Sequence, residues 1–434
     1  MNAVTVVVVE GAVLIAGAVL GVIAHVRGWR PSVRIALLVG VGLRVAVMGL
    51  AAADPHQPVD LWDSFLQAGQ DVLHRRDPVL TPDSGWHFLP MSAYGFALTL
   101  LTGLPWEVAL RLYPMAADIV LIVLVGRLAR DGERELRRFQ YACSPLAMLV
   151  CAVHGQLQSV ALVFGVAAFL AARSRRPGGA GALMGFALSA NSWPVMFLPG
   201  IAATLRRPGR WLRASAGVIG VPALFFVTLP IGVGTPIDRL PDVVGVVGGI
   251  RPVVGDWGWT AVATGGHQTL DSTLGRPGSI VLFATLFLAG WWWRRADPID
   301  LTIALVLAFL IVTPRLGAQY LLMPVPFLLV RSTRAAHLAM GAGALWAAFG
   351  YLYMTRLSWS GWQDVHVGWS LGSLIVIAFL IAAMPWRRRV AAPPVPESMR
   401  ETSPERAPEP EPAAVLPRAA PDPDAVTSPA RPGP

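Results

Sequence analysis

Polar residues that could carry out chemistry interrupt the apolar segments of this chain at three places. The interruptions fall at residues 154–158, 191–194 and 313–320, and each combines glycine or proline with amide, imidazole or charged side chains. An arginine such as Arg315 could hold an anion, amides could hold hydroxyl groups, and a nearby carboxylate could take a proton. The sequence therefore predicts either three tight turns or one shared polar site, and both interpretations stay open at this point.

Carboxylates are concentrated in the segment 54–87, which contains six aspartates. Apolar residues recur with helical spacing between 61 and 73, so we expect a short helix there. On such a helix Asp60 and Asp63 would lie one turn apart on the same face. A second long connection, 231–277, is rich in glycine and carries Arg251 and Trp257.

The elements that position these residues must be membrane helices. The chain has 434 residues, of which 54% are hydrophobic and 14% are charged, whereas soluble proteins carry about 25% charged residues. Its long apolar runs alternate with short arginine-rich segments. We interpret the net charge of +9 as arginines that hold loops on the cytoplasmic side, and not as a nucleic-acid surface.

The arginine clusters set the predicted topology, because the chain must leave and return between consecutive clusters on the inner side. This requirement predicts an all-α, polytopic bundle of about thirteen spans in the plasma membrane. The N-terminus is then outside and the C-terminal tail cytoplasmic. The predicted spans are 3–26, 33–53, 106–128, 139–153, 156–173, 178–190, 193–205, 211–230, 278–294, 298–312, 316–331, 335–355 and 366–385.

One apolar segment, 88–104, does not fit as a full crossing, because it would place the following arginines outside. We therefore expect a membrane-parallel or re-entrant helix in the outer loop. On this topology the three polar interruptions all lie at the outer end of the membrane. Irregular backbone at membrane depth survives only when it is buried in protein or lines a wet cavity, which favours a shared outer site.

Two further features concern the ends of the chain and the cysteines. Residues 1–390 form the predicted membrane domain, beginning with an uncleaved span, and the proline-rich residues 391–434 are predicted to be a disordered cytoplasmic tail. Cys143 and Cys151 lie eight residues apart in one apolar segment. On a helix they would be about 12 Å apart, which is too far for a disulfide.

Several short motifs together resemble the GT-C superfamily of membrane glycosyltransferases, in particular actinobacterial mannosyltransferases that use polyprenyl-phosphate-mannose. The resemblance depends on the order of the motifs between about residues 50 and 330. The motifs are Asp-Leu-Trp-Asp-Ser-Phe at 60–65, Arg-Asp-Pro at 76–78, Trp-His-Phe-Leu-Pro at 86–90, Ser-Pro-Leu at 144–146, His-Gly-Gln at 154–156, Asn-Ser-Trp-Pro at 191–194, the loop 251–259 and the segment 314–326.

The resemblance implies transfer of a sugar, with mannose the first expectation, from a polyprenyl-phosphate donor to an acceptor hydroxyl at the extracytoplasmic face. Asp60 occupies the position of the family's acidic residue and is the preferred general base, with Asp63 the alternative. Ten further residues are expected to bind substrate: His87, His154, Gln156, Gln158, Asn191, Arg251, Trp257, Arg315, Gln319 and Tyr320. Trp257 would stack on a sugar ring or belong to an interfacial tryptophan belt.

Two positions depart from the family pattern. Gln158 replaces an acidic residue and Asn191 replaces a lysine, so the alternatives are a catalytically degenerate relative and a transporter or flippase for a lipid-linked sugar. The expected partners are the lipid bilayer, the lipid-linked donor and a glycolipid, glycan or protein acceptor of the cell envelope, with no nucleic acid. No cofactor is expected and no metal-ligand spacing occurs, although Asp60 and Asp63 could share a divalent cation.

Overall fold

The computed structural model describes residues 3–82, 85–248, 253–270 and 272–387. Arg251 and the tail predicted at 391–434 lie outside the described residues. The described chain is helical, with no β-strand and a single isolated bridge between Val254 and Thr269. The predicted all-α class is therefore confirmed for the part of the chain that the structure describes.

Seven helices are long and apolar enough to cross a membrane, by their length and composition. Such helices are compatible with a membrane protein, as the sequence predicts. The seven are α1 (Ala3–Arg27), α2 (Val33–Ala52), α5 (Trp106–Leu128), α11 (Pro208–Gly232), α14 (Ser272–Trp293), α17 (Arg334–Ala348, continued by η6, Phe349–Tyr353, and η7, Met354–Arg356) and α18 (Trp359–Ala383).

Shorter helices occupy the other six predicted spans. A helix such as α8, with 16 residues, rises by about 24 Å, which is less than the 30 Å or so of a hydrocarbon core. The count of thirteen full crossings thus stays a prediction. These shorter elements are α6 (Arg134–Ala142), α7 (Pro145–Met148), η2 (Leu149–His154), α8 (Gln158–Arg173), α9 (Pro177–Ala190), η3 (Trp193–Phe197), α10 (Leu198–Leu205), α15 (Pro298–Val312), η5 (Ala318–Leu322) and α16 (Val325–Val330).

The helices are interrupted at the three places that the sequence predicts. Helix η2 ends at His154 because Gly155 adopts a left-handed conformation, with φ of 78°, which glycine adopts without steric cost. Helix α9 ends at Ala190, and Asn191 is extended. Helix α15 ends at Val312, shortly before Pro314, which has no N–H to continue a helix.

The start of the last helix differs from the prediction. Helix α18 begins at Trp359 and not near residue 366. Ser358 caps it by accepting a hydrogen bond from the Gly361 amide at 3.3 Å. His366, buried within the helix, pairs with Asp256 at 2.9 Å, so this polar residue has a partner inside the protein.

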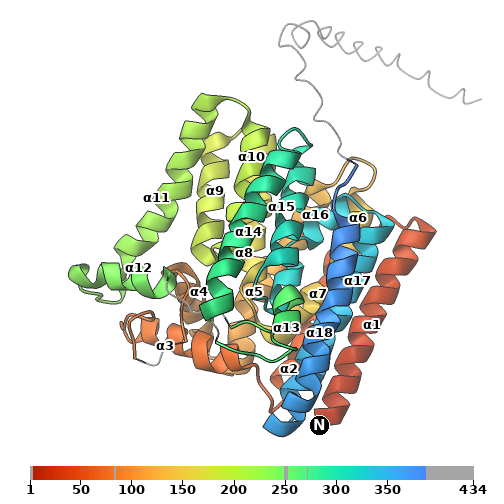
Figure 1. The fold of residues 1–434 in the computed structure, drawn as a ribbon, viewed down its shortest axis with the longest axis horizontal. Coiled ribbons are helices and arrows are strands. Elements are labelled where there is room, and N and C mark those ends of the chain that lie inside the picture. Colours follow the sequence, from red (N-terminus) through yellow and green to blue (C-terminus); the bar gives the residue numbers. More distant parts are fainter. Residues whose placement is uncertain (1–2, 83–84, 249–252, 271, 388–434) are drawn as a thin grey trace, which may run out of the picture. The chain divides into compact units, whose positions relative to one another are not determined.

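The connection between α2 and α5 contains three short helices: η1 (Asp60–Leu66), α3 (Gln67–Leu73) and α4 (Pro90–Leu100) (Figure 1). The helix expected at 61–73 is therefore present. The 11 residues of α4 rise by only about 16 Å, too little for a crossing. Phe96 of α4 stacks on Phe65 of η1, with ring centroids 4.8 Å apart, and this packing holds the connection together.

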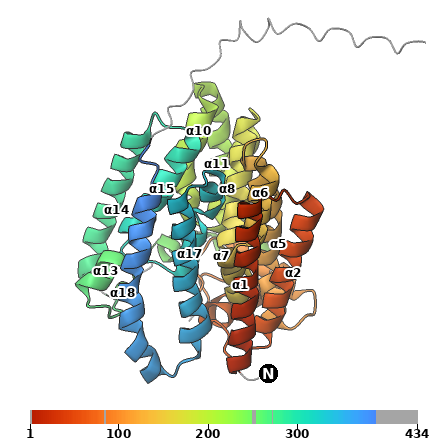
Figure 2. The ribbon, with the colours of Figure 1, turned by 90° about the vertical axis from the view of Figure 1, so that its right-hand side faces the viewer.

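Helices α1, α2, α5 and α17 run along one another, and α1 begins at the opposite end of the bundle from the end of α18 (Figure 2). A fully buried ion pair joins α2 to α5: Arg44 Nε donates to Asp118 Oδ2 at 2.6 Å. Tyr141 of α6 donates its hydroxyl to the other oxygen of Asp118 at 2.6 Å. Both cysteines are free and buried, as expected from their spacing.

Candidate functional site

The first residue of η1 is Asp60, and its carboxylate is exposed. Gln156, two residues after the end of η2, donates its side-chain amide to Asp60 Oδ2 at 2.5 Å. The Asp60 charge also acts electrostatically on His87, His154 and Tyr320. One predicted site residue therefore contacts this carboxylate, and three more lie within its electrostatic range.

The π-helical turns of the described chain all contribute to this cluster. Asp60 lies on η1, His154 on η2 and Tyr351 on η6. The rings of His154 and Tyr351 are 4.6 Å apart, and Tyr351 Oη donates to Gln319 Oε1 at 3.2 Å. π-Helical turns are rare in proteins overall, and those that occur often lie at functional sites. Their convergence therefore marks this region as a candidate site.

Arg315 supplies positive charge to the same region. Its charge acts on His87 and Tyr320, the two groups that Asp60 also affects. Arg315 is partly exposed, and it forms no ion pair with any residue that the structure describes. A guanidinium with five donors and no carboxylate partner can bind an anionic ligand directly.

His87 lies beside the cluster as a neutral group. Burial lowers the pKa of its imidazole, and the nearby Arg315 lowers it further, against the opposing effects of the Gly85 carbonyl and Asp60. Its Nδ1 is 2.9 Å from the Gly85 carbonyl oxygen, and its ring packs against Phe88 at 4.2 Å. At neutral pH His87 therefore offers a hydrogen bond and not a positive charge.

The interruptions before α8 and after α9 carry polar atoms that have no partner within the described residues. Gln158 and Asn191 are buried, and Gln158 Oε1, Asn191 Nδ2 and Trp193 Nε1 have no hydrogen-bond partner within the described structure. Helix α4 connects the interruption after α9 to η1, because Ser92 donates to the Ala190 carbonyl at 3.4 Å while Phe96 stacks on Phe65. No described hydrogen bond joins Gln158 or Asn191 to Asp60.

Asp63 and Trp257 are joined to Asp60 by no hydrogen bond within the described residues. Asp63 is exposed, and a side chain at Gly85 would meet its Oδ2 at 3.3 Å. The Gly85 carbonyl also contacts His87, so Asp63 stays the alternative base that the sequence predicts. Trp257 is fully buried and donates its indole N–H to the Leu310 carbonyl at 2.6 Å. Its ring packs on Trp346, so it is a packing residue and not a platform for a sugar.

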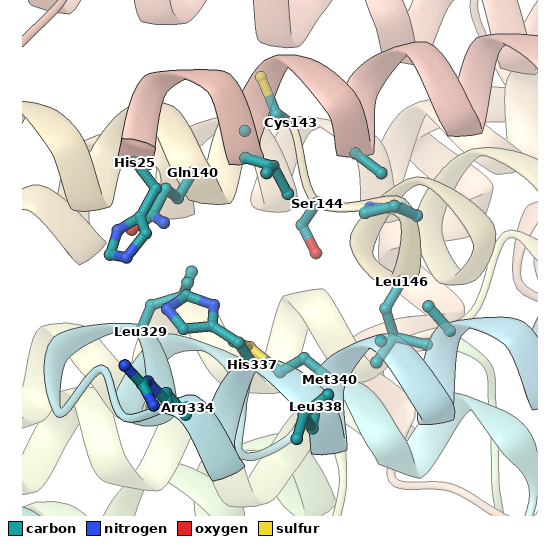
Figure 3. Close-up of a pocket in the computed structure, with 16 residues that line it drawn as sticks. His25, Gln140, Cys143, Ser144, Leu146, Leu329, Arg334, His337, Leu338 and Met340 are labelled. Carbon is teal, nitrogen blue, oxygen red and sulfur yellow. The ribbon is translucent and has the colours of Figure 1, made fainter. Parts of the chain in front are cut away.

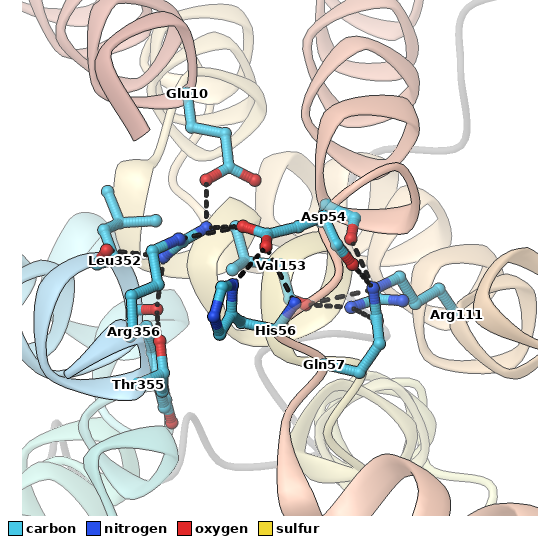
Figure 4. Close-up of polar contacts among 11 residues, drawn as sticks. Glu10, Asp54, His56, Gln57, Arg111, Val153, Leu352, Thr355 and Arg356 are labelled. Carbon is cyan, nitrogen blue, oxygen red and sulfur yellow. Dashed lines mark hydrogen bonds and ion pairs between the residues drawn. The ribbon is translucent and has the colours of Figure 1, made fainter. Parts of the chain in front are cut away.

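A charged network behind the cluster was missed by the sequence analysis (Figure 4). Arg111 of α5 donates to the Val153 carbonyl from Nε at 3.0 Å and from Nη2 at 2.7 Å. These bonds hold the last turn of η2, directly before His154. The signal in the sequence was an arginine inside a predicted span, because such residues need partners within the protein.

The same network fixes the π-helical turn that carries Tyr351. Arg356, at the end of η7, donates from Nε to Asp54 Oδ2 at 2.8 Å and lies 3.2 Å from Glu10 Oε2. Gln57 accepts from Arg111 at 2.9 Å and donates to the Ala51 carbonyl at 2.9 Å. These contacts tie α1, α2, α5 and η7 together around the candidate site.

Within the described residues, no group of three or more His, Cys, Asp or Glu side chains could hold a metal ion. A comparison with protein-family models finds no match to the chain. A comparison with curated proteins finds no match either.

Proposed function

We propose that this protein is a membrane glycosyltransferase that transfers a sugar from a polyprenyl-phosphate donor to an acceptor hydroxyl. The observation that carries the proposal is the hydrogen bond from Gln156 to the exposed Asp60, together with the electrostatic action of both Asp60 and Arg315 on Tyr320. A base, an unpaired cation and several hydrogen-bonding groups then lie in one site. This is the set of groups that the resemblance to the GT-C superfamily also implies.

The reaction uses each of these groups in a definite way. The acceptor oxygen attacks the anomeric carbon and its proton passes to Asp60, while the bond from that carbon to the phosphate oxygen breaks. The electron pair of the broken bond stays on the phosphate, which leaves with an additional negative charge. Arg315 stabilises this charge, as preorganised cations do for leaving phosphates. Attack opposite the leaving group inverts the anomeric configuration.

The hydrogen bond from Gln156 supports the role of Asp60. The donated N–H holds the Asp60 carboxylate in one orientation, in which it can accept a proton from an acceptor hydroxyl. The exposure of Asp60 leaves its second oxygen open to an acceptor. Within the proposal, the open end of the site faces the extracytoplasmic side, and the donor's prenyl chain lies between helices in the bilayer.

The departures from the family pattern at Gln158 and Asn191 affect substrate binding and leave the general base, Asp60, unchanged. Their unpartnered amide atoms can bind sugar hydroxyls, since a buried amide gains stability from any partner. Without the family's lysine at position 191, Arg315 is the cation that supports loss of the phosphate. Mannose, arabinose and glucose all satisfy this description of the donor.

The experiment uses the purified full-length protein, labelled polyprenyl-phosphate sugars and membranes of the source organism depleted of the protein. We expect label from one donor, with polyprenyl-phosphate-mannose tried first, to appear in a membrane acceptor. Sealed vesicles provide the second measurement. Movement of the intact donor across the vesicle membrane without formation of product would replace the proposal with the transporter alternative, and no change in either assay would indicate a degenerate relative.

A further inference from the structure

A pocket lies far from Asp60, at the opposite end of α1 and α17. The contact of Glu10 with Arg356 lies near the candidate site, whereas the pocket includes His25 and His337 of the same two helices. Fifteen residues of helix separate Glu10 from His25, which corresponds to about 22 Å. Helix α1 continues from His25 to Arg27, so this pocket lies at an arginine-bearing end.

The pocket has a volume of about 550 Å³, which is within the usual range of about 300–1,000 Å³ for ligand pockets. It is open on one side between α1, the segment from α6 to α7, and α17 (Figure 3). Most of its wall is apolar or small, including Gly21, Leu146, Gly341 and Ala344. Such a wall suits a hydrocarbon chain.

The polar groups of the pocket are concentrated at one end. His25 and His337 face each other with ring centroids 5.2 Å apart, and Arg334 lies beside them (Figure 3). The side chains of His25 and Arg334 form no hydrogen bond or ion pair with other residues in the described part of the chain. None of the residues that line the pocket is acidic.

We propose that this pocket binds an acidic phospholipid, with its phosphate at Arg334, His25 and His337 and one acyl chain along the apolar wall. Arginine and histidine N–H groups donate to phosphate oxygens. Basic pockets between membrane helices commonly hold acidic head groups in this way. Arg137 adds positive charge, because it acts electrostatically on His337, although Arg137 is itself paired with Glu133 at 3.2 Å.

This site is independent of the proposed sugar transfer, since it shares no residue with the Asp60 cluster. Two kinds of variant test it separately. Arg334→Gln combined with His337→Gln removes the anion-binding groups. Gly341→Leu fills the wall, because a side chain there meets open space and projects into the pocket.

Each variant has a matched control. Arg34 is an exposed arginine in the first turn of α2, as Arg334 is in the first turn of α17. Arg34→Gln therefore controls for loss of a helix-start arginine. Gly42→Leu places a leucine on another exposed helical glycine with open space around it.

The measurement is native mass spectrometry of the full-length protein, titrated with phosphatidylglycerol or with phosphatidylcholine of the same chain length. We expect the wild type and both controls to bind one molecule of phosphatidylglycerol at least tenfold more tightly than phosphatidylcholine. The double variant should lose this preference, and Gly341→Leu should lose the bound lipid. Equal binding of the two lipids by the wild type, or an unchanged preference in the double variant, would overturn the proposal.

Discussion

Two polar clusters of this bundle, around Asp118 and around Asp60, differ in how completely their groups are paired. Around Asp118, every charged group has a partner: Arg44 bonds to the carboxylate and to the Gly40 and Ala142 carbonyls, and Tyr141 bonds to the second oxygen. Around Asp60, Arg315 has no ion pair within the described chain and His154 Nδ1 has no partner. Both clusters are built from residues within helices and from residues at the ends of interrupted helices.

This difference indicates two roles for polar groups in one membrane domain. A fully buried ion pair can only hold helices together, because no ligand reaches it. Unpaired polar atoms are costly unless something binds them. The pairing of the Asp118 cluster indicates a structural role, and in the proposed function the Asp60 cluster is the one that a substrate completes.

The largest effect on stability is expected at the paired cluster. Asp118→Asn leaves the Arg44 charge buried and uncompensated, so the free energy of unfolding should fall by about 3–5 kcal/mol. Thermal denaturation of the purified protein in detergent measures this loss. The control is Asp131→Asn, because Asp131 pairs with Arg134 at an exposed position. Equal thermal stability of the two variants would contradict the structural role of Asp118.

Loss of the unpaired cation should affect the reaction and not the fold. Arg315→Gln removes the charge that stabilises the leaving phosphate, so the rate of sugar transfer should fall about a hundredfold. Its unfolding free energy should stay within about 0.5 kcal/mol of the wild type. Arg30→Gln, at an exposed arginine outside the cluster, should retain the wild-type rate. A fully active Arg315→Gln protein would rule out this role for Arg315.

An unpaired buried amide should contribute to binding and not to stability. Asn191→Leu removes no hydrogen bond of Nδ2, so the protein should be as stable as the wild type or slightly more stable. Its transfer rate should fall about tenfold, as expected for the loss of one hydrogen bond to a charged or hydroxylated ligand.

Ser159→Ala is the control for a paired buried group, because Ser159 donates to the Pro114 carbonyl at 3.0 Å. That change should lower the free energy of unfolding by about 1 kcal/mol. The two denaturation curves together distinguish the paired from the unpaired group. If Asn191→Leu proves the less stable variant, the classification of Asn191 as a ligand-binding residue fails.

The smallest expected effect is the titration of His87. Burial and Arg315 lower its pKa, so the neutral form is favoured in the folded protein. Its contribution to stability is present above the ordinary histidine pKa of about 6.5 and is lost as the pH falls through that value towards the lower pKa of the folded state. NMR of labelled histidine, assigned with His87→Gln, measures the midpoint. In Arg315→Gln the midpoint should rise, and an unchanged midpoint would contradict their proximity.

The sequence allowed more of the fold to be predicted than of the site. Apolar runs and arginine clusters predicted the positions of the helices, and Gly155, Asn191 and Pro314 predicted where helices stop, because these residues act on the local backbone. The start of α18 was placed too late, because the pairing of His366 with Asp256 joins distant segments and leaves no local pattern.

The candidate site was predicted only in part, because contacts between distant segments leave no local pattern in the sequence. Asp60, Gln156, Arg315 and Tyr320 were chosen from the motifs that contain them. The structure joins Asp60 to Gln156 by a hydrogen bond, and the membership of Arg315 and Tyr320 in one site stays a prediction. Tyr351 was missed because it lies inside an ordinary apolar span and becomes notable only through its contact with His154. Asp63 was placed on the same face as Asp60 on the assumption of an α-helix, and the structure has both residues in the π-helical turn of η1.

The most direct test of the account compares Asp60→Asn with Asp63→Asn, two aspartates of one exposed helical turn. Both proteins are assayed for transfer of labelled sugar from the polyprenyl-phosphate donor that the wild type accepts. Asp60→Asn should lower the rate by about 10²–10⁴-fold, because the general base is removed, and Asp63→Asn should stay close to the wild type. A wild-type rate in Asp60→Asn would contradict the assignment of this cluster as the site of reaction.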